Sequence, residues 1–187
     1  MGHPVLTLTS ASHAGMRKDQ VYALVESGEL ERIGRGVYVD IRRIDPSLAS
    51  FAAATALKPT STLCLTSALV HHGLSDAIPF ATDIALPRGT RHPSGFDHVS
   101  WHSFDRETFD VGRNLIRLDG LSLAIYSAER TIIDAFRLAH REGTDQAYDA
   151  LKRWIRVPGN QPSTLLDVAT SFPKAGPRIR HALEVLL

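Results

Sequence analysis

The sequence predicts an α+β protein built from two units, residues 1–44 and residues 45–187. Two helix patterns followed by a strand hairpin occur within the first unit. Asp45-Pro46 then marks a boundary, because proline disfavours helical geometry in the residue before it. Beyond that boundary, apolar helices, a few short strands and a helical tail predict a mixed α/β domain with a small sheet and C-terminal helices.

The composition is that of an ordinary globular protein. Hydrophobic residues make up 43% and charged residues 22% of the 187 residues, and the formal net charge is +1. Such a small net charge gives no sign of a nucleic-acid partner, so any basic surface must come from local clustering.

The sequence gives no indication of export or of a membrane. Cys64 is the single cysteine and lies in an apolar run, so we expect a small buried side chain there. The first residues do not resemble a signal peptide, and no uninterrupted apolar stretch approaches the ~18 residues of a membrane span. We therefore expect a cytoplasmic protein that does not contact a membrane.

Two short helices are expected to open the first unit. A hydroxyl side chain, Thr7 or Thr9, is suited to cap a helix that stops at Gly15. In the second helix the apolar residues recur from Val21 at the i, i+3, i+4 spacing of one helix face. Gly28 is expected to end that helix in a left-handed cap.

A β-hairpin is expected to close the first unit. Leu30 and Ile33 begin a strand, the glycines at 34 and 36 make a tight turn, and residues 37–39 return as a second strand. Helix, turn, helix and hairpin in this order are the outline of a winged helix-turn-helix.

The second unit is expected to contain helices, a few strands and a helical tail. Its helices are predicted over residues 47–58, 61–74, 127–141, 144–156, 162–172 and 176–187. Its strands are predicted over residues 83–89, 98–104, 114–120 and 121–127. Asp119-Gly120 is a strong hairpin turn, and Ser127 and Thr144 are the expected helix caps.

These patterns resemble a known family. The stretch LTLTSASHAGMRKDQVYALVESGELERIGRGVYV resembles the N-terminal winged helix of the AbiEi-type antitoxins of type IV toxin–antitoxin systems. The matching features are a hydroxyl-capped short helix, Gly15, a helix ending in Gly28-Glu29-Leu30, and Arg32 and Arg35 ahead of Gly36-Val37-Tyr38. The segments TSALVHHGLS, DIALPRGTR, LDGLSLAIYSAERTIIDAFR and LEVLL follow in the family's order, so the resemblance extends over nearly the whole chain.

The resemblance implies an antitoxin that also regulates transcription. The winged helix would bind operator DNA, and the second domain would oppose a nucleotidyltransferase-like toxin. Relatives carry a further helix ahead of the first one, whereas only a few residues precede Thr7, so we expect the helix-turn-helix to lack that packing partner.

The candidate DNA-binding residues follow from how such a domain binds DNA. The N-terminal residues of the second helix lie nearest the bases, where arginine pairs with guanine, glutamine pairs with adenine and lysine suits a phosphate. Small Gly34 and Gly36 would let the hairpin approach a phosphate or a minor groove. The candidate residues are Arg17, Lys18, Gln20, Arg32, Arg35, Tyr38, Arg42 and Arg43.

Two points about this set stay open. Residues 16–43 carry six basic and five acidic side chains, so only their segregation onto separate faces makes a DNA-binding surface; otherwise the module contacts protein. Tyr38 suits stacking on a sugar-phosphate, but a tyrosine in Val-Tyr-Val also suits packing under the hairpin.

A second basic surface is a weaker candidate. Arg88 and Arg91 lie on a Gly/Pro-rich segment that is expected to be an exposed loop. Three further basic residues, Lys152, Arg153 and Arg156, surround Trp154 on a predicted helix. Basic residues beside an aromatic suit DNA or an acidic partner, and the alternative is a solvated helix face with Trp154 in the core.

No pattern in the second unit indicates catalysis. His98 and His102 lack cysteine or acidic neighbours at zinc-ligand spacing, so no metal site is expected. Arg130 and Asp134 form an i, i+4 pair that suits fixing a helix against the sheet, whereas Glu129 and Asp134 diverge around the helix. No nuclease carboxylate–lysine pattern, Walker loop, dinucleotide fingerprint or nucleophile elbow occurs.

We therefore expect a non-enzymatic antitoxin without cofactor or metal, whose partners are operator DNA and a cognate toxin that it opposes with or without direct contact. Two alternatives remain. One is a DNA-processing, nuclease-like enzyme with an unrecognised active site, and the other is a protein-interaction module with a vestigial winged helix.

Overall fold

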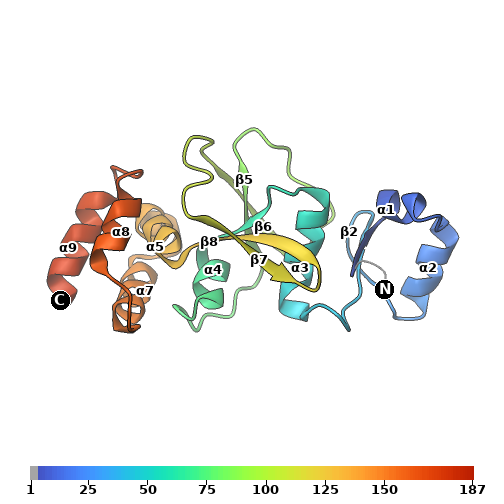
Figure 1. The fold of residues 1–187 in the computed structure, drawn as a ribbon, viewed down its shortest axis with the longest axis horizontal. Coiled ribbons are helices and arrows are strands. Elements are labelled where there is room, and N and C mark those ends of the chain that lie inside the picture. The colour runs from blue at the N-terminus through green and yellow to red at the C-terminus, as the bar shows by residue number, and fades with distance from the viewer. Residues whose placement is uncertain (1–3) are drawn as a thin grey trace.

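The computed structural model describes residues 4–187, apart from the side chain of residue 142, so the first three residues of the predicted 1–44 unit lie outside the described part. The molecule is elongated: the N-terminal helices and their small sheet lie at one end, the C-terminal helices lie at the other, and a larger sheet lies between them (Figure 1). This arrangement confirms the predicted α+β class.

The first unit contains two helices and a small antiparallel sheet. Its elements are β1 (Val5–Thr7), α1 (Leu8–His13), α2 (Lys18–Glu26), β2 (Glu31–Gly34) and β3 (Val37–Val39). Thr7 rather than Thr9 caps α1: its hydroxyl accepts a hydrogen bond from the Ser10 amide at 3.0 Å, and the Ser10 hydroxyl accepts one from the Thr7 amide at 2.9 Å. Gly28 ends α2 with a φ of +75°, as predicted.

The strand order in this sheet is β1-β3-β2, and the two faces pack against different partners. Successive side chains of a strand point to opposite faces. Tyr38 therefore faces α1 and α2, whereas Val37 and Val39 face α3 (Pro46–Leu57) on the other side. Strand β1, not predicted from its three residues, and helix α3 thus provide packing partners for the helix-turn-helix.

Helix α3 is packed between two sheets. It contacts all three strands of the small sheet and also β5 (Thr82–Pro87) and β8 (Leu121–Tyr126) of the larger one. Phe51 and residues 52–54, all alanines, are fully buried. One continuous hydrophobic cluster runs from Val39 through Ala53 to Leu123. Small alanines let both sheets approach the helix closely, so the predicted boundary at Asp45 lies at the start of a helix that both units share.

The larger sheet has five strands. In addition to β5 and β8 it contains β4 (Thr62–Leu63), β6 (Val99–Phe104) and β7 (Arg113–Leu118), in the order β6-β5-β4-β8-β7. The pairs β5–β6 and β4–β8 are parallel, and the pairs β4–β5 and β7–β8 are antiparallel. Asp119 and Gly120 both have positive φ angles in the β7–β8 turn, in agreement with the predicted hairpin.

The helix predicted over residues 61–74 is wrong in its first part. Residues 62–63 form β4 at the centre of the sheet, and α4 (Leu65–His71) begins only after the buried Cys64. A short apolar run suits a buried strand and a buried helix equally, and here pairing with β5 and β8 decides for the strand.

The C-terminal helices form a bundle with its own hydrophobic core. They are α5 (Ala128–Arg137), α6 (Ala139–Glu142), α7 (Thr144–Arg156), α8 (Pro162–Ala169) and α9 (Gly176–Leu186). The predicted helix over residues 127–141 breaks at Leu138, and Gly143 precedes α7 as its cap in place of the predicted Thr144. Trp154 lies in this core, buried among the side chains of the surrounding helices.

A buried ion pair fixes α5. The Arg130 Nε donates to the Asp134 carboxylate at 2.9 Å, and both side chains are 0% exposed. The same guanidinium donates to the carbonyls of Thr108 and Val111 at 2.7 and 2.6 Å. These bonds compensate most of the positive charge of the buried Arg130 guanidinium. This confirms the structural interpretation of the Arg130–Asp134 pair.

The packing of α3 makes a testable prediction about stability. We expect Ala53→Leu to lower the free energy of unfolding by about 1–3 kcal/mol, because the added carbons must separate the two sheets. Ala56→Leu, on the exposed side of the same helix, is the matched control and should change it by less than about 0.5 kcal/mol. Chemical denaturation measures both, and equal effects would contradict the two-sided packing of α3.

Candidate nucleic-acid interface

The N-terminus of α2 faces solvent and carries two of the predicted residues. Arg17 and Lys18 are both exposed, and Arg17 lies 3.2 Å from the Asp19 carboxylate in an exposed ion pair. Gln20 caps the helix: its side-chain oxygen accepts a hydrogen bond from the Arg17 amide at 2.8 Å. The predicted contact of Gln20 with adenine needs this oxygen. The bond instead holds the oxygen against the end of the helix.

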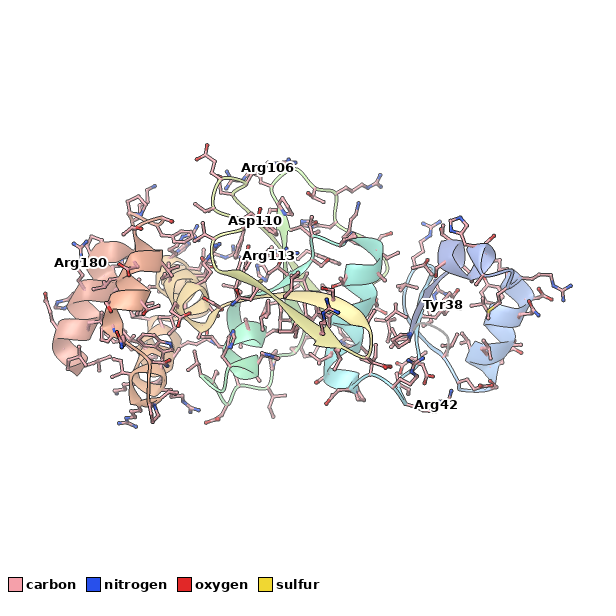
Figure 2. All side chains as sticks on the ribbon, in the orientation of Figure 1. Tyr38, Arg42, Arg106, Asp110, Arg113 and Arg180 are labelled. Carbon is pink, nitrogen blue, oxygen red and sulfur yellow. The ribbon has the colours of Figure 1, made fainter. Side chains whose placement is uncertain are left out.

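Tyr38 is buried beneath the helices. Its side chain is 3% exposed and packs with Ala11 and Val21, in the space between the small sheet and α2 (Figure 2). Burial, and then the neighbouring Tyr22 with which it shares a hydrogen bond, raise the pKa of Tyr38 above its ordinary value. A ring so enclosed cannot stack on DNA, so the prediction of a DNA contact at Tyr38 is wrong and its packing interpretation is correct.

Tyr22, which the sequence did not single out, lies beside two of the predicted residues. It is 43% exposed on α2, and the Lys18 ammonium lies 5.4 Å from the centre of its ring. Arg32 is the direct cross-strand partner of Tyr38, and Lys18 and Arg32 both act electrostatically on the Tyr38 hydroxyl. A signal was available, since Lys18 and Tyr22 have the i, i+4 spacing of neighbours on an exposed helix face.

The hairpin turn contacts the second unit. Gly34 is buried, and a Cβ placed there would lie 2.7 Å from the ring of Phe96. A Cβ on Gly95 would lie 3.1 Å from the backbone nitrogen of Arg35. The absence of a side chain at Gly34 therefore serves packing against the β5–β6 loop, and the predicted approach to a phosphate at Gly34 is wrong. Gly36 has a φ of +74°, which the turn itself requires.

Aromatic rings fix the loop that meets this turn. Phe96 packs edge-to-face on Trp101 of β6, with ring centres 5.6 Å apart. His92 stacks on Trp101 at 5.8 Å and hydrogen-bonds the Ser103 hydroxyl at 3.1 Å. Since Phe96 touches both Trp101 and Gly34, the hairpin is attached to the larger sheet and does not project freely.

Arg42 and Arg43 do not extend the basic surface. Arg42 pairs with the carboxylate of Asp40 at 3.1 Å and with that of Glu29 at 3.8 Å, on the segment that leads to α3 (Figure 2). The hydrogen bond from Arg42 lowers the pKa of Asp40, so that carboxylate stays ionised. Arg43 lies 2.8 Å from Asp119 in the β7–β8 turn. Both arginines are balanced by carboxylates, so they add little positive charge to this face.

Three cations of the set keep their charge uncompensated. Among the described side chains, no carboxylate lies within ion-pair distance of Lys18, Arg32 or Arg35. The structure brings Lys18 and Arg32 together around the tyrosines, while Arg17 lies beside Lys18 and Arg35 lies at the hairpin turn. The exposed Asp19 and Glu26 lie on the same helix, so the positive region is small.

The second basic set divides in the same way. Arg88 pairs with Asp105 at 3.1 Å, and Arg153 pairs with Asp76 across the gap between α7 and the segment after α4. The remaining members are exposed; they are Arg91, Lys152 and Arg156. Trp154 is buried and contributes no ring to a surface, so the solvated-face interpretation of that helix is correct.

The histidines are used in separate contacts. His102 lies 2.9 Å from the Asp83 carboxylate, and His72 lies 2.7 Å from the Tyr126 carbonyl. The described side chains form no group of three or more His, Cys, Asp or Glu placed to share a metal ion. Within residues 4–187, every helix is too short or too polar to traverse a bilayer.

Two helices, an antiparallel hairpin and a third strand on the same sheet give the first unit an arrangement compatible with a winged helix-turn-helix. Residues 1–39 match the model of a protein family described as "Transcriptional regulator, AbiEi antitoxin". The match ends with β3, just before α3, and it confirms the resemblance for the winged helix. No curated protein matches the chain. Beyond residue 39, the resemblance stays a prediction.

The contact between Gly34 and Phe96 is testable by a double-mutant cycle. We expect Gly34→Ala to lower the free energy of unfolding by about 1–3 kcal/mol, because the new methyl displaces the ring. In a Phe96→Ala background the same substitution should cost less than about 0.5 kcal/mol.

Gly176→Ala is the matched control for this cycle, because a Cβ at Gly176 would meet nothing within 4 Å. Its unfolding free energy should stay constant or rise slightly. A Gly34→Ala cost that is the same with and without the Phe96 ring would show that the hairpin does not depend on this contact.

Proposed function

We propose that this protein is the antitoxin of a type IV toxin–antitoxin system and represses its own transcription by binding operator DNA. The observation that carries the proposal is the match of residues 1–39 to AbiEi transcriptional regulators, on a winged helix whose α2 begins with exposed Arg17 and Lys18. The uncompensated charges of Lys18 and Arg32 support it, since phosphate neutralisation supplies much of the affinity for DNA.

Each residue of the interface has a role in this proposal. Arg17 reads a base in the major groove; its exposed ion pair with Asp19 is weak and exchanges readily for a better partner. Lys18 and Arg32 bind phosphates on either side of Tyr22. The side-chain hydrogen bond between Tyr38 and Tyr22 orients the Tyr22 hydroxyl at the surface, where it can contact a phosphate oxygen.

The first test is binding to DNA taken from directly upstream of the chain's own reading frame. Lys18→Ala and Arg32→Ala should each weaken binding by about 1 kcal/mol and flatten the salt dependence by about 0.9 per lost phosphate contact. Arg17→Ala should cost about 1–3 kcal/mol and relax the sequence preference. Anisotropy titrations at several salt concentrations measure all three.

The matched control for these titrations is Lys152→Ala, an exposed lysine on α7 toward the opposite end of the molecule (Figure 1). It should leave affinity and salt slope unchanged. If the folded wild-type chain bound this DNA no better than unrelated DNA, the repressor proposal would be wrong, and a protein-interaction module would remain.

The tyrosine pair offers a second test. Tyr38→Phe keeps the buried ring but removes its hydroxyl, so it should weaken DNA binding by freeing Tyr22, although Tyr38 itself touches no DNA. Tyr22→Phe should weaken binding to a similar extent, about 1 kcal/mol. The double variant should lose no more than either single variant, because both act through one hydrogen bond. Additive losses would contradict this coupling.

We further propose that the second unit opposes a nucleotidyltransferase-like toxin by binding and not by catalysis. The family description supports the antitoxin role. Asp134, one of the two α5 carboxylates considered for hydrolysis, is engaged in packing, since it bonds to Arg130 in the core. Expression of the neighbouring reading frame should arrest growth, and coexpression of this chain should restore it.

Cleavage of DNA by the purified chain with magnesium or manganese would favour the nuclease alternative.

A further inference from the structure

Two large apolar side chains project from the segment that joins α4 to β5. Ile78 is 96% exposed and Phe80 is 91% exposed. A phenylalanine left in water forgoes the burial of about 150 Å² or more of surface. These two residues, with only Pro79 between them, form a small apolar knob. An apolar knob that stays in water has no stabilising role in the single chain, which indicates a binding partner.

A hollow of about 500 Å³ lies directly beside this knob. Its walls come from both units: Ile33 and Ile41 from the first, Leu48 from α3 and Val70 from α4. Ile78 and Phe80 themselves form part of its rim. Glu31, His71 and His98 also line it, so the hollow is a mainly apolar recess with an apolar knob on its edge.

We propose that this face is a dimer interface at which a second copy of the chain inserts Ile78 and Phe80 into the hollow. In a two-fold dimer the same patch on each chain must complement itself. A knob beside a hole meets that condition, because a two-fold axis at the rim brings each knob over the partner's hole. The two insertions then occur together, and both knobs leave water.

The expected size of the contact agrees with a second copy. Two Phe80 side chains of about 150 Å² each, with two Ile78 side chains and the walls that all four cover, bury on the order of 1,000 Å². This is about the size at which specific interfaces begin. A small molecule in the hollow would leave the outer faces of Ile78 and Phe80 in water, so it accounts for the recess but not for the knob.

The dimer goes beyond the proposed function and does not depend on it. Ile33 and Ile41 place the hollow against the first unit, so a two-fold axis there holds two winged helices in fixed relation. Symmetric pairs of such domains read inverted repeats. The oligomeric state is nevertheless measured without DNA, so failure of the dimer and failure of DNA binding are separate results.

The test is the mass of the full chain in solution across a range of concentrations, by light scattering and sedimentation equilibrium. The wild-type protein should reach the mass of a dimer, and Ile78→Asp and Phe80→Asp should each shift it to monomer at the same concentrations. The monomeric variants should keep the circular dichroism spectrum of the wild type, because both side chains lie in water in the single chain and do not support its fold. Leu115→Asp, at a 65% exposed apolar residue on β7 outside the hollow, is the control and should leave the dimer intact.

A second measurement, disulfide cross-linking, leaves Ile78 and Phe80 unchanged. Cysteine at the exposed Ala77 should form a cross-linked dimer under mild oxidation, because Ala77 would lie near the two-fold axis, and adding Phe80→Asp should abolish the cross-link. The native Cys64 is buried and does not compete. A wild-type chain that stays monomeric at all concentrations overturns the proposal, and so does a dimer that survives Phe80→Asp.

Discussion

The burial of α3 on two sides is the interaction on which the rest of the structure depends. Its alanines supply one hydrophobic layer to the small sheet of the winged helix and to the five-stranded sheet together. Side chains this small let both sheets pack on one helix without a gap. The Arg43–Asp119 ion pair and the Phe96–Gly34 contact then join the two units at further points, so the winged helix has a fixed orientation on the second unit.

This attachment determines which surface is left for a partner. The hairpin turn, which in an isolated winged helix projects freely, is partly covered by the β5–β6 loop at Gly34. The arginines that follow the hairpin are paired with carboxylates. What remains open is the outer face of α2 with the adjoining part of β2, where Lys18, Tyr22 and Arg32 meet over the buried Tyr38. Any binding to DNA must therefore rely on α2 more than on the wing.

Much of the fold was predictable because helix caps and turns depend on residues close together in the sequence. The Thr7 cap, the left-handed Gly28 and the Asp119-Gly120 turn each act within a few residues. The candidate site was predictable only in part. Lys18 and Arg32 were predicted from their places in the motif. Tyr22 was not, although its i, i+4 spacing from Lys18 was visible, because its contact with Tyr38 depends on how the chain folds. Strand β4 was missed because two buried residues carry no periodic pattern.

The sequence by itself determined the α+β class, the order of nearly all the elements and the likeness of the first unit to a family of regulators. Periodicity, caps and glycine turns are local and act wherever the chain is placed. Only the tertiary structure decided which charges are compensated, why residue 34 is glycine, and that Ile78 and Phe80 stay in water beside an apolar recess. Those outcomes depend on contacts between residues that are far apart in the chain. The local sequence around one residue does not show which distant residue it will contact.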